Sequence, residues 1–228
     1  MHIKKVVVLS GAGISAESGL KTFRDSNGLW EEFKIEEVAS IEGWKANPKK
    51  VLDFYNARRI QAQKAQPNRA HQFFAELEKD YDLTIITQNV DDLHERGGSS
   101  DVLHLHGTLN HYKCTQGCHH GALKNDLNLA SKCPSGYQLR PDIVWFGEEV
   151  PAYAKAIELV RKCDLLIIVG TSLQVYPAAN LAFQAERASQ IILIDPHAQD
   201  LATQGLENLH IIKSKATDAL EELSLILS

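Results

Sequence analysis

The sequence has little cysteine, no long apolar run and no excess of basic residues. Its 228 residues include 4 cysteines, too few for the disulfide framework of a small secreted domain. The longest apolar run, residues 165–169, is far shorter than the ~20 residues that a membrane helix needs. The run at residues 6–9 is likewise too short for the apolar core of a signal peptide. We therefore expect a cytoplasmic protein with no membrane partner.

The charge balance also limits the partners. The chain has 24 Lys and Arg against 29 Asp and Glu, a net charge of -5 with neutral His. This balance argues against nucleic acid held by bulk electrostatics. At this length, folding buries roughly 70% of the surface that the unfolded chain exposes, so a stable core needs no covalent staple.

Short apolar segments alternate with helical patterns along the chain. The segments are rich in Val, Ile and Leu and fit buried strands at residues 6–9, 83–87, 102–105, 143–146, 165–169 and 191–194. The intervals contain a helix capped by Asn68 and helices at residues 153–162, 177–187 and 217–227. This alternation predicts an α/β fold, a Rossmann-like parallel sheet with helices on both faces.

Two stretches depart from this alternation. Residues 27–66 show no strand pattern but contain a strong helix, with Asn47 as its N-cap and Pro48 in its first turn. Residues 109–141 hold three cysteines and show weak periodicity. We therefore divide the chain into a nucleotide-binding domain, residues 1–26, 67–108 and 142–228, and a small module, residues 27–66 and 109–141.

Groups that can hold a nucleotide follow three of the predicted strands. The segment GAGIS at residues 11–15 lets the backbone turn sharply and approach a phosphate. The segment GTS at residues 170–172 follows another strand, and Asp195, which can accept a ribose hydroxyl, ends a third. Because the carboxyl ends of parallel strands meet at one edge of a sheet, these groups point to one crevice. A glycine turn by itself is also compatible with a purely structural role.

Two more polar segments lie at predicted strand ends. The segment TQNVDDLH at residues 87–94 offers amide and carboxylate groups that can bind a carboxamide or a sugar. Capping of a helix that begins near Asp91 is the alternative. In the segment LHG, strand alternation places His104 and His106 on one face. An imidazole can take a proton near neutral pH, although a single strand histidine is more often structural.

Taken in order, the motifs are GAGIS-x-x-SG, FR, TQN-x-D-x-LH, LHG, a cysteine-bearing insert, LRP-x-x-V-WFGE and GTSL-x-V-x-P. This order resembles the sirtuin family of NAD-dependent protein lysine deacylases, from about Val6 to Ala216. The resemblance implies NAD as the cofactor and acylated lysine side chains, bound in extended peptides, as the partners. It also implies nicotinamide and O-acyl-ADP-ribose as products.

The resemblance assigns roles to individual residues. His106 is the implied general base, the catalytic residue. The implied NAD-binding residues are Gly11, Ala12, Gly13, Ile14, Glu17, Thr22, Phe23, Arg24, Gln88, Asn89, Val90, Asp91, Gly170, Thr171, Ser172, Asp195 and Ala216. The implied substrate-binding residues on the peptide edges are Val144, Phe146, Gly147, Glu148 and Val175. The family usually has Asn where Asp195 stands, and either side chain can accept a ribose hydroxyl.

The cysteine insert departs from the two C-x-x-C pairs that hold zinc in the family. Gly117 and Gly136 stand where the second cysteine of each pair is expected. The ligands left for a zinc ion are Cys114, Cys118 and Cys133, with His119 or His120 as a fourth. Because structural zinc needs four closed ligands, we expect a remnant of the site that holds no metal.

The helix at residues 48–64 bears on the choice of acyl group. At 100° per residue, Arg58 falls within the apolar arc that contains Phe54 and Tyr55. A cation at that position needs an anion, and an acidic residue of the same chain is one alternative. Tyr55 and Arg58 also match the Tyr-x-x-Arg of sirtuins that remove negatively charged acyl groups. We therefore predict that succinyl- and malonyl-lysine are preferred and that acetyl-lysine is also accepted.

Other functions share some of these features. An NAD-dependent ADP-ribosyltransferase or an NAD hydrolase would keep the cofactor, but neither needs His106 together with the peptide edge. A non-enzymatic NAD-binding interaction module is the second alternative, in which the cysteine insert docks a partner. Self-association has no signal in the sequence, and we expect a monomer.

Overall fold

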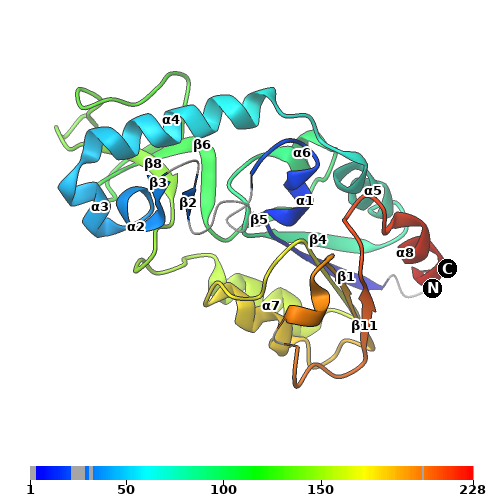
Figure 1. The fold of residues 1–228 in the computed structure, drawn as a ribbon. Helices are drawn as coiled ribbons and strands as arrows, with labels where there is room; N and C mark the ends of the chain where they lie inside the picture. Colours follow the sequence, from blue (N-terminus) through cyan, green and yellow to red (C-terminus); the bar gives the residue numbers. More distant parts are fainter. Residues whose placement is uncertain (1–3, 22–28, 31–32, 202, 228) are drawn as a thin grey trace.

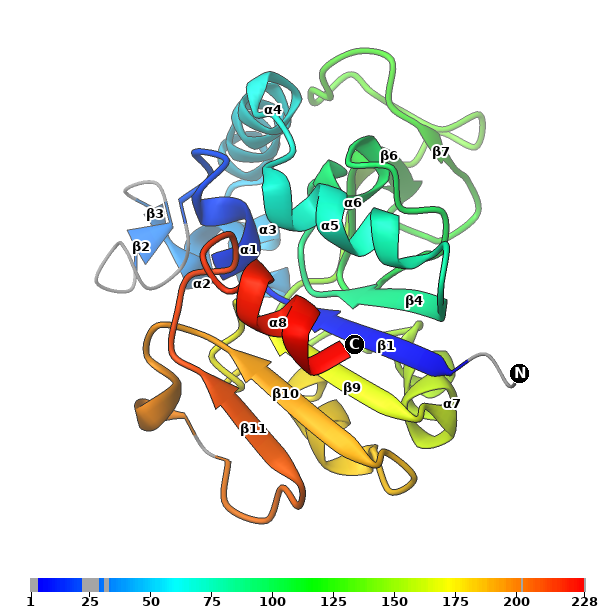
Figure 2. The same cartoon turned by 90° about the vertical axis from the view of Figure 1, so that its right-hand side faces the viewer.

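A parallel sheet of six strands forms the centre of the protein, in the order β11-β10-β9-β1-β4-β5 (Figures 1 and 2). The computed structural model describes residues 4–21, 29–30, 33–201 and 203–227. The strands are β1 (Lys5–Ser10), β4 (Asp82–Thr87), β5 (Val102–His104), β9 (Leu165–Val169), β10 (Gln190–Ile194) and β11 (Leu209–Ile212). The chain starts in β1, adds β4 and β5 on one side, and then adds β9 to β11 on the other. The order therefore reverses beside β1, and ligands of such sheets bind at the carboxyl ends of the strands at that point.

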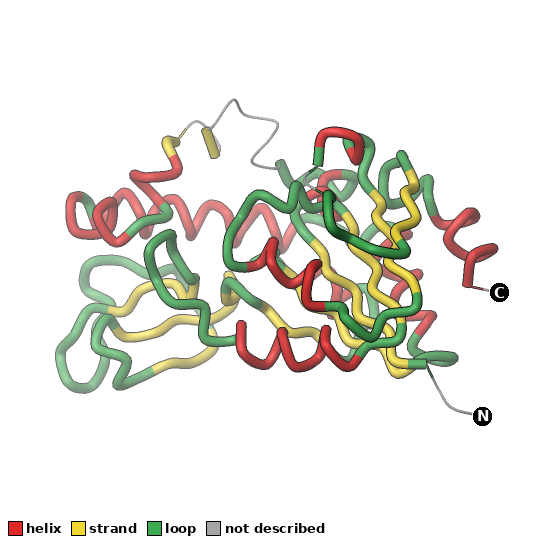
Figure 3. Tube along the Cα trace, turned by 90° about the horizontal axis from the view of Figure 1, so that it is seen from below, coloured by secondary structure: helices red, strands yellow, loops and turns green. Residues whose placement is uncertain are grey.

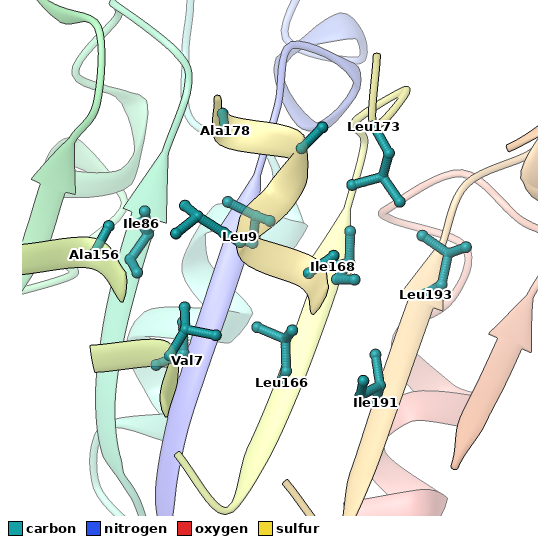
Figure 4. Packing of buried hydrophobic residues seen from close by; sticks show 14 of the residues in the cluster. Val7, Leu9, Ile86, Ala156, Leu166, Ile168, Leu173, Ala178, Ile191 and Leu193 are labelled. Atoms are coloured by element: carbon teal, nitrogen blue, oxygen red, sulfur yellow. The ribbon is translucent and has the colours of Figure 1, made fainter. Parts of the chain in front are cut away.

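Apolar side chains cover both faces of this sheet. On one face, Val7 and Leu9 pack with residues of α7 (Tyr153–Lys162) and of the 3₁₀ helix η2 (Ala178–Gln184) (Figure 4). On the other face, Val6 and Val8 pack with residues of α5 (Arg69–Leu77) and α8 (Leu220–Leu227). Because the central strands are buried on both faces, they read in the sequence as continuous apolar runs.

A second sheet of three antiparallel strands lies at the end of the molecule away from both chain termini (Figure 1). Its order is β7-β6-β8, with β6 (Gly107–Cys114), β7 (His120–Ala122) and β8 (Leu139–Ile143). The long helix α4 (Pro48–Lys64) runs along this sheet, and its apolar side chains share a cluster with Leu109, Ile143 and Trp145. Figure 3 shows the two sheets as separate groups of strands.

The remaining described elements are short. They are α1 (Gly13–Ala16), β2 (Leu29–Trp30), β3 (Phe33–Lys34), α2 (Ile35–Val38), α3 (Ile41–Ala46), α6 (Leu93–Arg96) and η3 (Ala198–Asp200). Among the described residues, no helix is both long enough and apolar enough to cross a membrane.

The α/β fold with a parallel sheet is confirmed, and so are two of the predicted helix caps. The Asn47 side chain accepts a hydrogen bond from Lys50 N at 3.0 Å, and the Asn68 side chain accepts from Ala70 N at 3.0 Å. Both caps satisfy amide groups that a helix leaves without a partner at its start.

Three of the predicted elements differ from the structure. The strand predicted at residues 143–146 is wrong: β8 ends at Ile143, and the Trp145 amide turns to the Glu148 carboxylate at 2.9 Å. The helix predicted at residues 177–187 is the 3₁₀ helix η2, whose i,i+3 apolar pairs give a similar sequence pattern. The stretch 27–66, predicted to lack strands, contains β2 and β3, and β11 was not predicted.

Candidate active site

Two glycine turns meet where β1 and β9 end. Gly13 N donates to Gly170 O at 2.8 Å, and Gly11 N donates to Val169 O at 3.0 Å. A Cβ atom on Gly170 would lie 2.3 Å from Ile14 N, and its φ of +62° also favours glycine. The predicted turn and the GTS segment are therefore in direct contact, and only glycines allow the backbones to approach so closely.

Hydrogen bonds also hold other predicted NAD-binding residues in place. Gln88 Nε2, which follows β4, donates to Thr171 Oγ1 at 2.8 Å. Asp195, buried at the end of β10, accepts from His197 N at 2.8 Å. Glu17 accepts from Thr217 Oγ1 at 2.7 Å, which places it beside Ala216. The ends of β1, β4, β9 and β10 thus contribute polar groups to one edge of the sheet, as the sequence predicts.

The side chains of Asn89 and Asp91 are held by Ser15 of α1. Asn89 Nδ2 donates to Ser15 Oγ at 3.1 Å, and Ser15 Oγ donates to Asp91 Oδ2 at 3.3 Å. The second carboxylate oxygen of Asp91 accepts from Leu93 N at 3.1 Å. Burial raises the pKa of Asp91, and these hydrogen bonds oppose the rise. The amide and the carboxylate are therefore fixed in place before any ligand arrives.

A buried series of hydrogen bonds next to Asn89 was not predicted from the sequence. Ser10 Oγ donates to Thr87 Oγ1 at 2.8 Å, and Thr87 Oγ1 accepts from Asn89 N at 3.0 Å. His94 Nε2 lies 2.9 Å from Ser10 Oγ, and since the Ser10 proton goes to Thr87, His94 is the donor. Burial lowers the pKa of His94 well below its ordinary value, so the ring is neutral. The signal in the sequence is the position of Ser10 and Thr87 as the last residues of two central strands.

His106 follows β5 and has the properties of a general base. Its Nδ1 lies 3.1 Å from Gln88 O. Because a carbonyl oxygen only accepts, Nδ1 carries the proton and Nε2 is left to take one. Burial lowers the pKa of His106, and the Gln88 carbonyl partly offsets this effect. The ring is therefore neutral at neutral pH, as proton abstraction requires.

The segment after β8 carries the residues predicted for one peptide edge. Val144 N donates to His106 O at 2.9 Å, and Phe146 N donates to Ala39 O at 2.9 Å. Phe146 and Gly147 are exposed, whereas the Glu148 carboxylate accepts two bonds of 2.7 Å from the Arg140 guanidinium. The structure thus ties this edge directly to His106 and directs the Glu148 carboxylate toward the protein. Val175, predicted for the opposite edge, is half-buried, and its carbonyl accepts from Ala179 N at 2.9 Å.

Tyr55 and Arg58 lie on the buried face of α4. The Tyr55 hydroxyl accepts from Trp145 Nε1 at 3.1 Å, and the two rings lie 6.5 Å apart. Burial raises the pKa of Tyr55, while the nearby charges of Arg140 and Arg58 lower it, so the hydroxyl keeps its proton. Val90 packs against the same apolar cluster, which connects Tyr55 to the segment that contains Asn89. Trp145 lies inside the WFGE motif of the predicted peptide edge.

The neighbouring arginine, Arg59, has an acidic partner. Its Nη2 lies 2.6 Å from Asp126 Oδ1, and this ion pair joins α4 to the cysteine-bearing segment. On the same helix, Arg58 Nη1 donates to Gln61 Oε1 at 3.0 Å. Three predicted NAD-binding residues, Thr22, Phe23 and Arg24, lie outside the described residues.

The expectation of a remnant without metal is wrong, because three cysteines form a cluster. The sulfurs of Cys114, Cys118 and Cys133 all lie within 4.8 Å of one another, at 3.1 Å between Cys114 and Cys118 and 3.7 Å between Cys118 and Cys133. Zn–S bonds of about 2.3 Å in a tetrahedral site place sulfurs about 3.8 Å apart. The cluster therefore fits a zinc ion, and binding of that ion would be coupled to the folding of the small sheet.

Known sequences match most of this chain. A sequence model of the Sir2 family matches residues 11–177. A protein of Helicobacter pylori strain J99 named NAD-dependent protein deacylase is 54% identical over 222 residues, which cover 97% of this chain and 94% of the relative. A protein of the same name from Bacteroides thetaiotaomicron is 45% identical over 232 residues, covering 99% of this chain and 98% of the relative.

Solved structures show the same fold. The crystal structure of a Sir2 homolog–NAD complex superposes with a TM-score of 0.87 at 39% identity, covering 98% of this chain and 90% of that chain. A Sir2 complex with the inhibitor EX-527, 2'-O-acetyl-ADP-ribose and a deacetylated p53 peptide superposes with a TM-score of 0.80 at 28% identity. The latter match covers 97% of this chain and 93% of that chain.

Proposed function

The chain belongs to the Sir2 family and is an NAD-dependent protein deacylase, and from this premise we propose how its residues act and which acyl groups it removes. Its substrates are acylated lysine side chains presented by extended peptides. The relatives solved with NAD and with a deacetylated peptide support both ligand classes. A single observation carries the proposal: His106 is neutral, with its Nε2 free of the proton, beside the residues that follow β4.

The NAD-binding residues predicted from the sequence each hold a different part of the cofactor. The glycine turns at residues 11–13 and 170 hold the pyrophosphate, Asp195 accepts from a ribose hydroxyl, and Asn89 and Asp91 hold the nicotinamide ribose. When bound, NAD supplies the electrophilic ribose carbon that the acyl oxygen attacks. His106 takes the proton of a ribose hydroxyl, and its Nδ1–H bond to Gln88 O keeps Nε2 directed to that task.

Replacing His106 tests this assignment. His106→Ala removes the base, and loss of a general base typically lowers the rate by ~10²–10⁴. The glycine turns and Asn89 remain, so NAD affinity should change by no more than a few fold. Deacylation measured by mass spectrometry, with NAD binding measured by calorimetry, separates the two effects. Turnover above about a tenth of the unmodified rate would contradict the role of His106.

The preference for succinyl- and malonyl-lysine rests on the position of a charge. Arg58 is 7% exposed and lies one helical turn from Tyr55, so both can reach the end of one acyl chain. Arg58 is close enough for its charge to lower the pKa of Tyr55. A substrate carboxylate would accept charge-assisted hydrogen bonds from the guanidinium, and the Tyr55 hydroxyl would add a neutral donor. Acetyl-lysine has no carboxylate and therefore forms none of these charge-assisted hydrogen bonds.

Arg58→Met tests the preference, because methionine keeps much of the apolar stem and removes the charge. Hydrogen bonds to charged groups contribute roughly 1.5–3 kcal/mol. That range corresponds to about 10- to 150-fold in kcat/KM at ~1.4 kcal/mol per decade. Desuccinylation should fall by about this factor, while deacetylation and NAD binding change little.

The matched control is Arg59→Met, on the same helix. Arg59 pairs with Asp126, so this variant should lower stability without changing the ratio of desuccinylation to deacetylation. Equal loss of both activities in Arg58→Met would show that Arg58 is structural. The deacylase activity itself would stand in that case, because it does not depend on the acyl preference.

Three further expectations from the sequence belong to the same proposal. The division into residues 1–26, 67–108 and 142–228 against residues 27–66 and 109–141 is supported by the separation of the six-stranded sheet from the three-stranded sheet. A cytoplasmic location and the absence of nucleic-acid and membrane partners rest on the composition. The monomeric state is checked by light scattering of the purified protein.

A further inference from the structure

The cysteine cluster offers three sulfur ligands where a closed zinc site has four. Among the described residues, no other His, Cys, Asp or Glu places a ligand atom within 4.8 Å of all three sulfurs. The fourth cysteine, Cys163, is buried against the large sheet in a different cluster. The described part of the chain therefore supplies three ligands in this arrangement.

Two similar turns show where the fourth ligand is missing. In the first turn, Gly117 N donates to Cys114 O at 2.9 Å, and in the second, Gly136 N donates to Cys133 O at 2.8 Å. Both glycines have positive φ, +69° and +84°. The residue after the first glycine is the ligand Cys118. The residue after the second is Tyr137, so tyrosine stands at the position that corresponds to the fourth sulfur.

The neighbouring histidines have other arrangements. The His119 ring lies 5.9 Å from the Tyr112 ring, and the His119 carbonyl accepts from Cys114 N at 2.7 Å. His120 belongs to β7 and pairs with Lys113 of β6. Both histidines are exposed, as is Cys118, whereas Cys114 and Cys133 are buried. Solvent therefore reaches the cluster at Cys118.

We propose that this chain binds zinc through Cys114, Cys118 and Cys133 and that the fourth position is open to an exchangeable ligand from solvent. The three thiolates would hold the ion, and the open position could take a ligand from solvent, such as water or a small thiol bound as its thiolate with its proton lost to solvent. A zinc ion with three protein ligands and one exchangeable ligand has the coordination of a catalytic or labile site and not that of a closed structural one. The site is thus a surface binding site for small thiols.

X-ray absorption at the zinc edge tests the proposal on the full-length protein. We expect one zinc per chain, with three sulfurs at about 2.3 Å and one oxygen or nitrogen at about 2.0–2.1 Å. Addition of 2-mercaptoethanol should raise the sulfur count to four. His119→Ala and His120→Ala should leave the original count unchanged. The cobalt-substituted protein should show a change in its visible spectrum on addition of the same thiol.

Tyr137→Cys is the matched variant, because it places a sulfur at the position equivalent to Cys118. It should show four sulfurs without added thiol, no response to 2-mercaptoethanol, and zinc transfer to a chelator slower by on the order of tenfold. Four sulfurs in the unmodified protein, a nitrogen lost in either histidine variant, or no bound zinc would each overturn the proposal. So would a cobalt spectrum that does not respond to thiol.

Discussion

The ion pair between Arg140 and Glu148 is expected to hold the peptide edge, and Glu148→Gln tests it. The pair is bidentate, with two N–O distances of 2.7 Å, and the Arg140 guanidinium lies 3.4 Å from the centre of the Trp145 ring. Arg140 also donates to Ile143 O at 2.7 Å. Glu148 accepts from Trp145 N at 2.9 Å. The two side chains thus fix the turn that carries the exposed Phe146.

The burial of the ion pair sets the expected loss of stability in Glu148→Gln. The side chains of Arg140 and Glu148 are 8% and 21% exposed, so removing one charge leaves the other largely buried. Breaking a buried pair in this way costs about 3–5 kcal/mol. Glutamine keeps one oxygen acceptor, which favours the lower limit. For a chain of this length, each kcal/mol lowers Tm by about 2–4 °C, so we expect a decrease of about 6–12 °C.

Thermal unfolding and steady-state kinetics measure the two effects. Glu148→Gln should raise the KM for the acylated peptide if the segment after β8 is the peptide edge, because that segment loosens, while NAD affinity should stay unchanged. The exposed neighbour gives the control: Glu149→Gln should leave both Tm and KM near their original values. A decrease in Tm below about 2 °C for Glu148→Gln would refute the reasoning, because it would show that the pair contributes less than about 1 kcal/mol.

Two further predictions concern the glycine turn and a histidine pair. In Gly170→Ala, the new Cβ atom would meet Ile14 N, so the KM for NAD should rise by at least about tenfold, a cost of ~1.4 kcal/mol. The control is Gly205→Ala, at a residue with a φ of +93° and open space around an added Cβ, and this variant should leave the KM for NAD unchanged. Burial opposes a charge on His104, but Glu95, 2.7 Å away, outweighs this effect and raises the pKa of His104. The His104–Glu95 pair therefore stabilises the folded state fully below the unfolded pKa of about 6.5, and this contribution is lost as pH rises through the folded pKa. Glu95→Gln should therefore lower the free energy of unfolding, measured with urea, more at pH 5.5 than at pH 8.5. An equal decrease at the two pH values would contradict the role of Glu95.

The sequence predicts the large sheet well and the small sheet poorly, for a physical reason. Strands such as β9 are buried on both faces, so their continuous apolar runs are unambiguous. In β6, exposed and half-buried positions dominate, and the run of polar residues before Cys114 shows no strand signal. The strand predicted at residues 143–146 failed because Glu148, a residue outside the predicted segment, binds the Trp145 amide.

Groups at the ends of strands were predictable, whereas groups behind them were not. A motif such as TQN marks residues that follow a strand, and the topology then brings them together. The role of Ser10 depends on two partners, Thr87 and His94, that are far from it in the sequence. The zinc expectation failed similarly: the register of cysteines in the sequence suggested a lost site, but the turns at Gly117 and Gly136 bring three sulfurs together.

His104 and His106 show how the structure distinguishes two candidates that the sequence leaves equivalent. Strand alternation places both on one face, and Nδ1 of each lies near a carbonyl oxygen of the segment after β4. The difference lies at Nε2. In His104 this nitrogen lies 2.7 Å from Glu95, which favours the charged ring and raises its pKa, whereas burial without such a carboxylate lowers the pKa of His106. A general base must be neutral before it accepts a proton, and the lowered pKa of His106 favours that state, whereas Glu95 already occupies Nε2 of His104.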